Sequence, residues 1–126
     1  MQQACRQVGK SEEYNPMATK DPREPFTRVS VAEAKKKIDG GGVQIVDVRT
    51  PGEYAGGHVP GAINIPHMSV VSRKDELAGD KELVMICQMG QRSALACEFA
   101  AAIGFKELFN VEGGTEAWIK AGYQVE

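Results

Sequence analysis

The residues best suited to chemistry lie in one segment, 83–93. Four apolar residues lead into Cys87, a short loop containing Gly90 follows, and Arg92 begins an alanine-rich helical pattern. A buried strand that delivers a cysteine to a helix N-terminus favours the thiolate, because loop N–H groups and the helix dipole stabilise its charge. Four residues separate Cys87 from Arg92, and the size of that ring limits which anion fits. The alternative is a buried structural thiol, since free cysteines are commonly buried.

The other loop residues supply N–H groups and uncharged side chains. Gly90 is expected to adopt a positive φ, so that successive N–H groups converge on the sulfur. Gln88, Met89 and Gln91 contribute N–H groups, and their side chains line the opening of the loop. Arg92 has two open roles: its guanidinium either folds back onto the loop carbonyls or points at an anionic donor. A solvated arginine at the start of a helix is the third alternative.

Composition and charge limit the classes of function. The 126 residues suffice for one domain, and a net charge of −2 gives no reason to expect a nucleic-acid or anionic-membrane partner. No apolar run approaches the roughly 20 residues of a membrane span. The three cysteines are an odd count without metal-like spacing, which argues against a disulfide framework and against a metal site. We therefore expect a cytoplasmic protein in a reducing compartment.

The elements that must position Cys87 are expected to form an α/β domain. Residues 1–25 contain three prolines and no sustained periodicity, which predicts a flexible N-terminal arm. Over residues 26–126 strand and helix patterns alternate, which predicts a single domain with a mostly parallel sheet. Ligands of such sheets bind beyond the carboxyl ends of the strands, where Cys87 lies. The expected strands cover 26–29, 43–48, 62–65, 83–86 and 107–111.

Capping residues mark where two helices begin. Ser30 and Glu33 form a capping box, and Thr50 caps a short helix with Pro51 at its first position and Glu53 at its third. The expected helices run from residue 31 to the glycines at 40–42, from the Thr50 cap, over 93–103 and over 115–121, with a modest helix or irregular crossover over 67–77.

Several segments together resemble the rhodanese-like domain family. Residues 47–54 and 57–66 resemble its N-terminal signature, residues 87–92 match its six-residue active-site loop, and residues 112–123 resemble its C-terminal signature. The resemblance covers roughly residues 26–125. It implies a three-layer α/β/α fold around a five-stranded parallel sheet, used once in this chain.

The family resemblance implies sulfur transfer. The family's catalytic cysteine, which maps to Cys87, takes a sulfane sulfur from thiosulfate or a persulfide and holds it as a cysteine persulfide, without a cofactor. It then passes the sulfur to a thiophilic acceptor, which is cyanide in vitro and a thiol in cells. Small donors, thiol acceptors and a sulfur-carrier protein are the expected partners of a monomer. Some thiosulfate-using relatives carry a basic residue inside the loop, whereas Arg92 is the one cation here, so a persulfide or protein donor is equally well supported.

The resemblance also assigns supporting residues. Asp47 and Arg49 would support the loop rather than act in acid–base catalysis, because sulfur transfer between thiolates needs little proton movement. His58 is expected to make a fixed hydrogen bond and is not assigned as a base, and His67 carries no signal. Cys97 lies in an apolar helical segment, which favours a core thiol over a resolving cysteine.

Two other functions compete with this interpretation. A phosphatase or arsenate reductase of the related cell-division-cycle fold has five residues between its cysteine and arginine, enough to hold a tetrahedral oxyanion, whereas this chain has four. A non-catalytic relay or regulatory module would use the same face to bind a partner.

Overall fold

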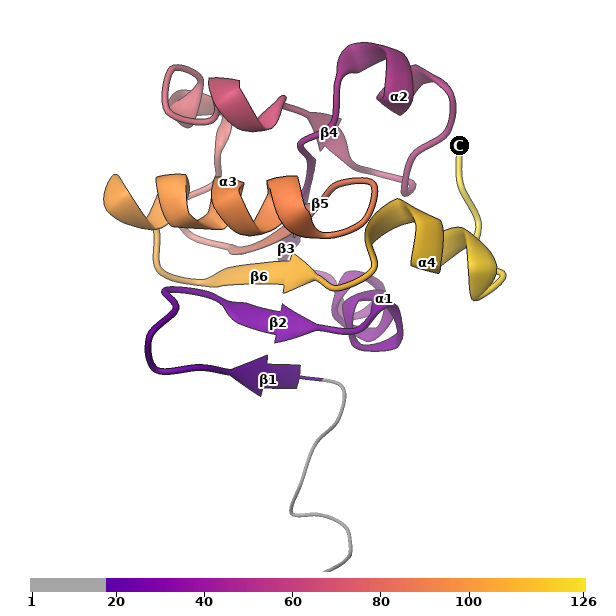
Figure 1. The fold of residues 1–126 in the computed structure, drawn as a ribbon, viewed down its shortest axis with the longest axis horizontal. Helices are drawn as coiled ribbons and strands as arrows, with labels where there is room; N and C mark the ends of the chain where they lie inside the picture. The colour runs from indigo at the N-terminus through magenta and orange to yellow at the C-terminus, as the bar shows by residue number, and fades with distance from the viewer. Residues whose placement is uncertain (1–17) are drawn as a thin grey trace, which may run out of the picture.

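The computed structural model describes residues 18–126, in which strands alternate with helices along most of the chain (Figure 1). The strands are β1 (Ala18–Lys20), β2 (Thr27–Val29), β3 (Val43–Asp47), β4 (Ile63–Asn64), β5 (Glu82–Ile86) and β6 (Leu108–Val111). The helices are α1 (Val31–Gly40), α2 (Pro51–Ala55), α3 (Gln91–Ala102) and α4 (Gly114–Lys120). The expected crossover over 67–77 is irregular and contains two 3₁₀ turns, η1 (His67–Ser69) and η2 (Lys74–Glu76).

The strands form one six-stranded sheet in the order β1-β2-β6-β5-β3-β4. The pairings from β2 to β4 are all parallel, which confirms the predicted α/β fold, and β1 adds a sixth, antiparallel strand at one edge (Figure 1). The predicted arm over 1–25 is therefore wrong for Ala18–Lys20, which pair with β2. A strand of three residues is too short to show periodicity in a sequence. Residues 21–25 of the predicted arm form the turn between β1 and β2, in which the Glu24 N–H donates to the Asp21 carbonyl at 2.9 Å, and residues 1–17 lie outside the described residues.

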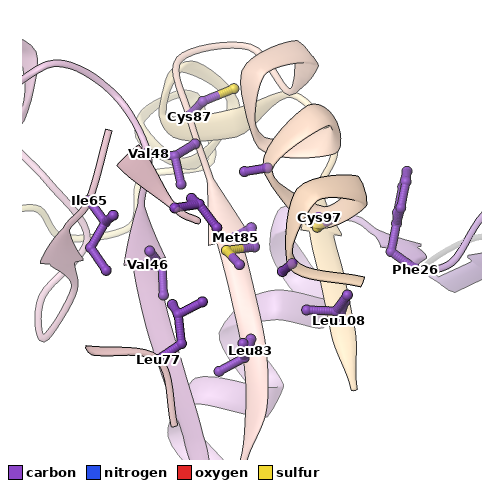
Figure 2. Close-up of a cluster of buried hydrophobic side chains, with 13 residues drawn as sticks. Phe26, Val46, Val48, Ile65, Leu77, Leu83, Met85, Cys87, Cys97 and Leu108 are labelled. Carbon is purple, nitrogen blue, oxygen red and sulfur yellow. The ribbon is translucent and has the colours of Figure 1, made fainter. Parts of the chain in front are cut away.

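The central strand β5 is buried on both faces, as its apolar sequence predicts. Leu83 and Met85 pack into one core cluster with residues of α3, including Cys97 (Figure 2). Val84 and Ile86 pack into a second cluster with residues of α1 and α4. Successive side chains of a strand point to opposite faces, so this alternation places α3 on one face and α1 and α4 on the other. The result is the expected three-layer architecture.

The parallel register brings the chemistry-bearing residues to one edge of the sheet. Asp47 at the end of β3 lies opposite Ile86 at the end of β5, and the Val48 N–H donates to the Ile86 carbonyl at 2.8 Å. Arg49, two residues after β3, and Cys87, the first residue after β5, consequently emerge at the same edge of the sheet. Within residues 18–126, no helix is long and apolar enough to cross a membrane.

Candidate active site

Cys87 follows directly after β5, and its sulfur lies between the loop and the first turn of α3 (Figure 2). The sulfur accepts hydrogen bonds from the Gly90 N–H at 3.0 Å and from the Ser93 hydroxyl at 3.3 Å. Only 1% of Cys87 is exposed. Two donors and the N-terminus of a twelve-residue helix therefore face one buried sulfur, and these groups favour negative charge on it.

The conformation of Gly90 directs its N–H at this sulfur. Its φ of 111° lies in the left-handed region, and it is the residue that precedes α3. A side chain at this position would meet the Gly113 nitrogen at 3.4 Å and the Val111 carbonyl at 3.6 Å. The predicted positive φ is confirmed, and it is this conformation, rather than a lack of space for a Cβ, that favours glycine here.

The carbonyls of the loop point away from the sulfur and onto the start of α4. The Cys87 carbonyl accepts from the Thr115 N–H at 2.8 Å and the Thr115 hydroxyl at 3.0 Å, and the Gln88 carbonyl accepts from the Glu116 N–H at 3.1 Å. Gly114 permits this approach, since a Cβ there would lie 2.5 Å from the Cys87 oxygen. Because α4 binds the carbonyls, the opposite side of the loop presents its N–H groups.

A buried amide on β6 completes the support of the loop. Asn110 is fully buried, and its Nδ2 donates to the Gly90 carbonyl at 3.2 Å and to the Glu112 carboxylate at 2.6 Å. Sequence analysis missed Ser93, Thr115 and Asn110 as parts of the site. The available signal was Asn110, a polar residue that interrupts an otherwise apolar strand.

A buried ion pair on the neighbouring strand contacts the loop. Arg49 and Asp47 are 3% and 0% exposed, and the Arg49 guanidinium donates to the Asp47 carboxylate at 2.8–3.1 Å. The same guanidinium donates to the Gln88 side-chain oxygen at 3.2 Å and to the Gly57 carbonyl at 2.7 Å. Asp47 thus orients Arg49, and Arg49 joins the loop to the segment after α2.

In the structure Arg92 contacts a carboxylate rather than the loop carbonyls, and its role toward an anionic donor stays a prediction. Its guanidinium forms a two-pronged contact with the Glu53 carboxylate of α2, at 2.8 and 3.0 Å. Glu53 also accepts from the Thr50 N–H at 3.1 Å and so belongs to the capping box of α2. The hydrogen bonds from Arg92 and then from Thr50 lower the pKa of Glu53 to about 2, so this carboxyl is charged at neutral pH.

His58 lies in the connection between α2 and β4. Its Nδ1 is 2.9 Å from the Tyr54 carbonyl oxygen, its ring stacks on the Tyr54 ring at a centroid distance of 3.7 Å, and its Nε2 is 3.4 Å from the Glu126 carboxylate. These contacts fix the connection that carries Gly57, the partner of Arg49. His67 begins η1.

The remaining side chains of the site differ in exposure. Met89 is 54% exposed at the opening of the loop, whereas Cys97 is fully buried, and burial raises the pKa of its thiol. The core position predicted for Cys97 is confirmed. Among residues 18–126, no group of three or more His, Cys, Asp and Glu side chains is arranged to hold a metal ion.

Comparison with known proteins places this geometry in a family. A model of the rhodanese-like domain matches residues 30–121. A sulfurtransferase from Allochromatium vinosum is 35% identical over 83 residues, 66% of this chain and 78% of that protein. The uncharacterized protein YqhL from Bacillus subtilis is 40% identical over 75 residues, a match that spans only 60% of the length of that relative. The crystal structure of a rhodanese-related protein from Thermoplasma volcanium has a TM-score of 0.72 at 34% identity, over 79% of this chain and 96% of that one.

Proposed function

The chain belongs to the rhodanese-like domain family, and on that premise we propose that it is a sulfurtransferase that carries sulfane sulfur on Cys87. The donor is thiosulfate or a persulfide, and the acceptor is a thiol in cells or cyanide in vitro. The observation that supports this proposal is that the buried Cys87 sulfur accepts hydrogen bonds from the Gly90 N–H and the Ser93 hydroxyl. The proposal requires no cofactor, because the cysteine itself holds the sulfur covalently.

The reaction consists of two displacements at sulfur. The Cys87 thiolate attacks the outer sulfur of the donor, a new S–S bond forms, and the old S–S bond breaks. The electron pair leaves with sulfite when the donor is thiosulfate, or with a thiolate when the donor is a persulfide. In the second displacement the acceptor attacks the terminal sulfur of the Cys87 persulfide, and the Cys87 thiolate is regenerated.

The loop contributes electrostatic stabilisation to both displacements. The Gly90 N–H and the Ser93 hydroxyl donate to the charge on Cys87, and the first turn of α3, which contains Ser93, adds the positive end of the helix dipole. Because the carbonyls are held by α4 and by Asn110, these donors need not reorganise as charge moves between the two sulfurs.

A matched pair of donors tests the proposal. The protein is incubated with thiosulfate or with cysteine persulfide, alkylated without reductant, digested with trypsin and analysed by mass spectrometry. Trypsin places the three cysteines on separate peptides, residues 1–6, 82–92 and 93–106. We expect one added sulfur on the 82–92 peptide, lost on addition of cyanide or thiol.

Two variants control this experiment. Cys87→Ser removes the expected adduct, whereas Cys97→Ser leaves it, because Cys97 is fully buried within α3 and burial raises the pKa of its thiol. If neither donor adds sulfur to Cys87 while this thiol still reacts with an alkylating reagent, the non-catalytic binding module becomes the better interpretation.

The loop length argues against phosphate chemistry. Four residues separate Cys87 from Arg92, and the Gly90 N–H already lies 3.0 Å from the sulfur. We expect negligible hydrolysis of p-nitrophenyl phosphate, and rapid turnover that depends on Cys87 would contradict the sulfurtransferase proposal. A monomeric state, a sulfur-carrier protein as partner and a cytoplasmic location stay predictions of the sequence.

A further inference from the structure

Both arginines that contact or belong to the sulfur-binding loop are held by carboxylates. Arg49 is paired with Asp47 at 2.8 Å, and Arg92 is paired with Glu53 at 2.8 and 3.0 Å. The residues between Cys87 and Arg92 carry no formal charge. Before Cys87 ionises, the loop and its two ion pairs are therefore neutral, and once it ionises they are negative.

The carboxylate that holds Arg92 is fixed independently of Arg92. Glu53 Oε1 accepts from the Thr50 N–H and from the Thr50 hydroxyl, each at 3.1 Å. Thr50 in turn caps α2, because its hydroxyl oxygen accepts from the Glu53 N–H at 3.3 Å. The helix start therefore holds a charged oxygen beside Arg92 through contacts that do not involve Arg92.

The pair between Arg92 and Glu53 lies at the start of α3, close to the buried sulfur, and is partly exposed to solvent. Their side chains are 31% and 35% exposed, whereas Cys87 is 1% exposed. Arg92 also lies in the first turn of α3, next to Ser93, whose hydroxyl donates to the sulfur. A guanidinium at this position would be suited to bind two oxygens of a sulfonate group, but that two-pronged face is occupied by Glu53.

We propose that Glu53 is a specificity-determining residue, which acts by occupying Arg92 and so disfavours thiosulfate relative to persulfides. This inference rests on the sulfurtransferase function proposed above. Thiosulfate carries two negative charges and releases sulfite, also a dianion, next to the Cys87 persulfide. A persulfide carries one charge on its sulfur and releases a singly charged thiolate. With Arg92 neutralised, the dianion meets the larger repulsion from the thiolate.

Glu53→Gln tests this role and leaves the helix cap in place. Glutamine at the third position of a capping box accepts the same backbone hydrogen bond, so α2 keeps its start while the negative charge is removed. The measurement is kcat/KM for thiosulfate divided by kcat/KM for cysteine persulfide. We expect this ratio to rise about tenfold in Glu53→Gln. A fraction of misfolded protein lowers both constants equally and leaves the ratio unchanged.

Two further variants separate this effect from a general loss of an ion pair. Glu76→Gln removes an ion pair of similar exposure, with Arg73, on a segment whose backbone binds Gln44 near the opposite end of β3, and it should not change the ratio. Adding Arg92→Gln to Glu53→Gln should return the ratio toward that of the wild type.

The outcomes distinguish this inference from the proposed function. If sulfur transfer occurs but Glu53→Gln leaves the ratio unchanged, or the double variant keeps the raised ratio, the role of Glu53 is overturned and the sulfurtransferase proposal stands. If the wild type takes sulfur from neither donor, both proposals are overturned.

Discussion

The hydroxyl of Ser93 lies 3.3 Å from the sulfur of Cys87, and both residues are buried. Ser93 belongs to α3, so the helix supplies a side-chain donor in addition to its backbone N–H groups. A hydrogen bond to a charged sulfur in a buried setting is worth more than one at a surface.

Removing this hydroxyl is expected to slow the reaction of Cys87. Ser93→Ala should lower the rate of persulfide formation about tenfold, because a hydrogen bond to a charged group contributes about 1.5 kcal/mol or more. Stopped-flow kinetics with cysteine persulfide measures this rate. The matched control is Ser72→Ala, since the Ser72 hydroxyl donates to the Ser69 carbonyl at an exposed site. Equal rates for the wild type and Ser93→Ala would show that the contact does not stabilise the thiolate.

A methyl group at Gly114 is expected to disrupt the loop. Gly114 has a φ of 60°, and a Cβ would lie 2.5 Å from the Cys87 carbonyl oxygen. Gly114→Ala should lower the free energy of unfolding by about 2 kcal/mol or more, and should reduce activity as well. Urea denaturation provides the measurement. Gly79→Ala is the control, because nothing lies within 4 Å of a Cβ built there. Similar denaturation midpoints for the two variants would contradict the close approach of α4 to the loop.

Breaking the buried ion pair between Asp47 and Arg49 is expected to lower the free energy of unfolding more than breaking an exposed ion pair. Asp47→Asn leaves the Arg49 guanidinium, which is 4% exposed, without its carboxylate and should lower the free energy of unfolding by about 3 kcal/mol or more. Asp39→Asn removes the exposed i,i+4 pair with Lys35 and should cost less than about 1 kcal/mol. An equal decrease in the free energy of unfolding for the two variants would mean that Asp47 is not required to compensate the buried charge of Arg49.

The lowered pKa of Glu53 predicts that the difference in melting temperature between the wild type and Glu53→Gln depends on pH. Its pKa is lowered from 4.5 to about 2 in the folded protein, chiefly by Arg92 and then by Thr50. A lowered folded-state pKa contributes stability that is fully present above the unfolded value and is lost as the pH falls through the folded value. The wild type should therefore melt at a higher temperature than Glu53→Gln above pH 5, and the two curves should converge toward pH 2. A constant difference over this range would indicate that the carboxyl charge contributes nothing.

Local patterns predicted much of this structure. Residues 83–86 form most of β5, the Thr50 cap begins α2, and Gly90 has the expected positive φ. In each case the deciding interactions lie within a few residues of one another. The loop itself was identified for the same reason, because a strand, a cysteine and a helix start are adjacent in the chain.

Contacts between distant segments were not predictable in this way. The Glu53 partner of Arg92 lies 39 residues away, and Thr115 lies 28 residues beyond Cys87. These pairs meet only because of the order of strands in the sheet and the packing of α2 and α4 at its edge. A single sequence contains no periodicity or spacing that encodes those two placements.

The support from α4 has a consequence for protein synthesis. The carbonyls of Cys87 and Gln88 obtain their hydrogen-bond donors from Thr115 and Glu116, which the ribosome adds 28 residues after each carbonyl. A nascent chain that ends before α4 thus already contains the nucleophilic cysteine but lacks the donors that orient its loop. The orientation of the loop thus depends on residues that are added late in the synthesis of this domain.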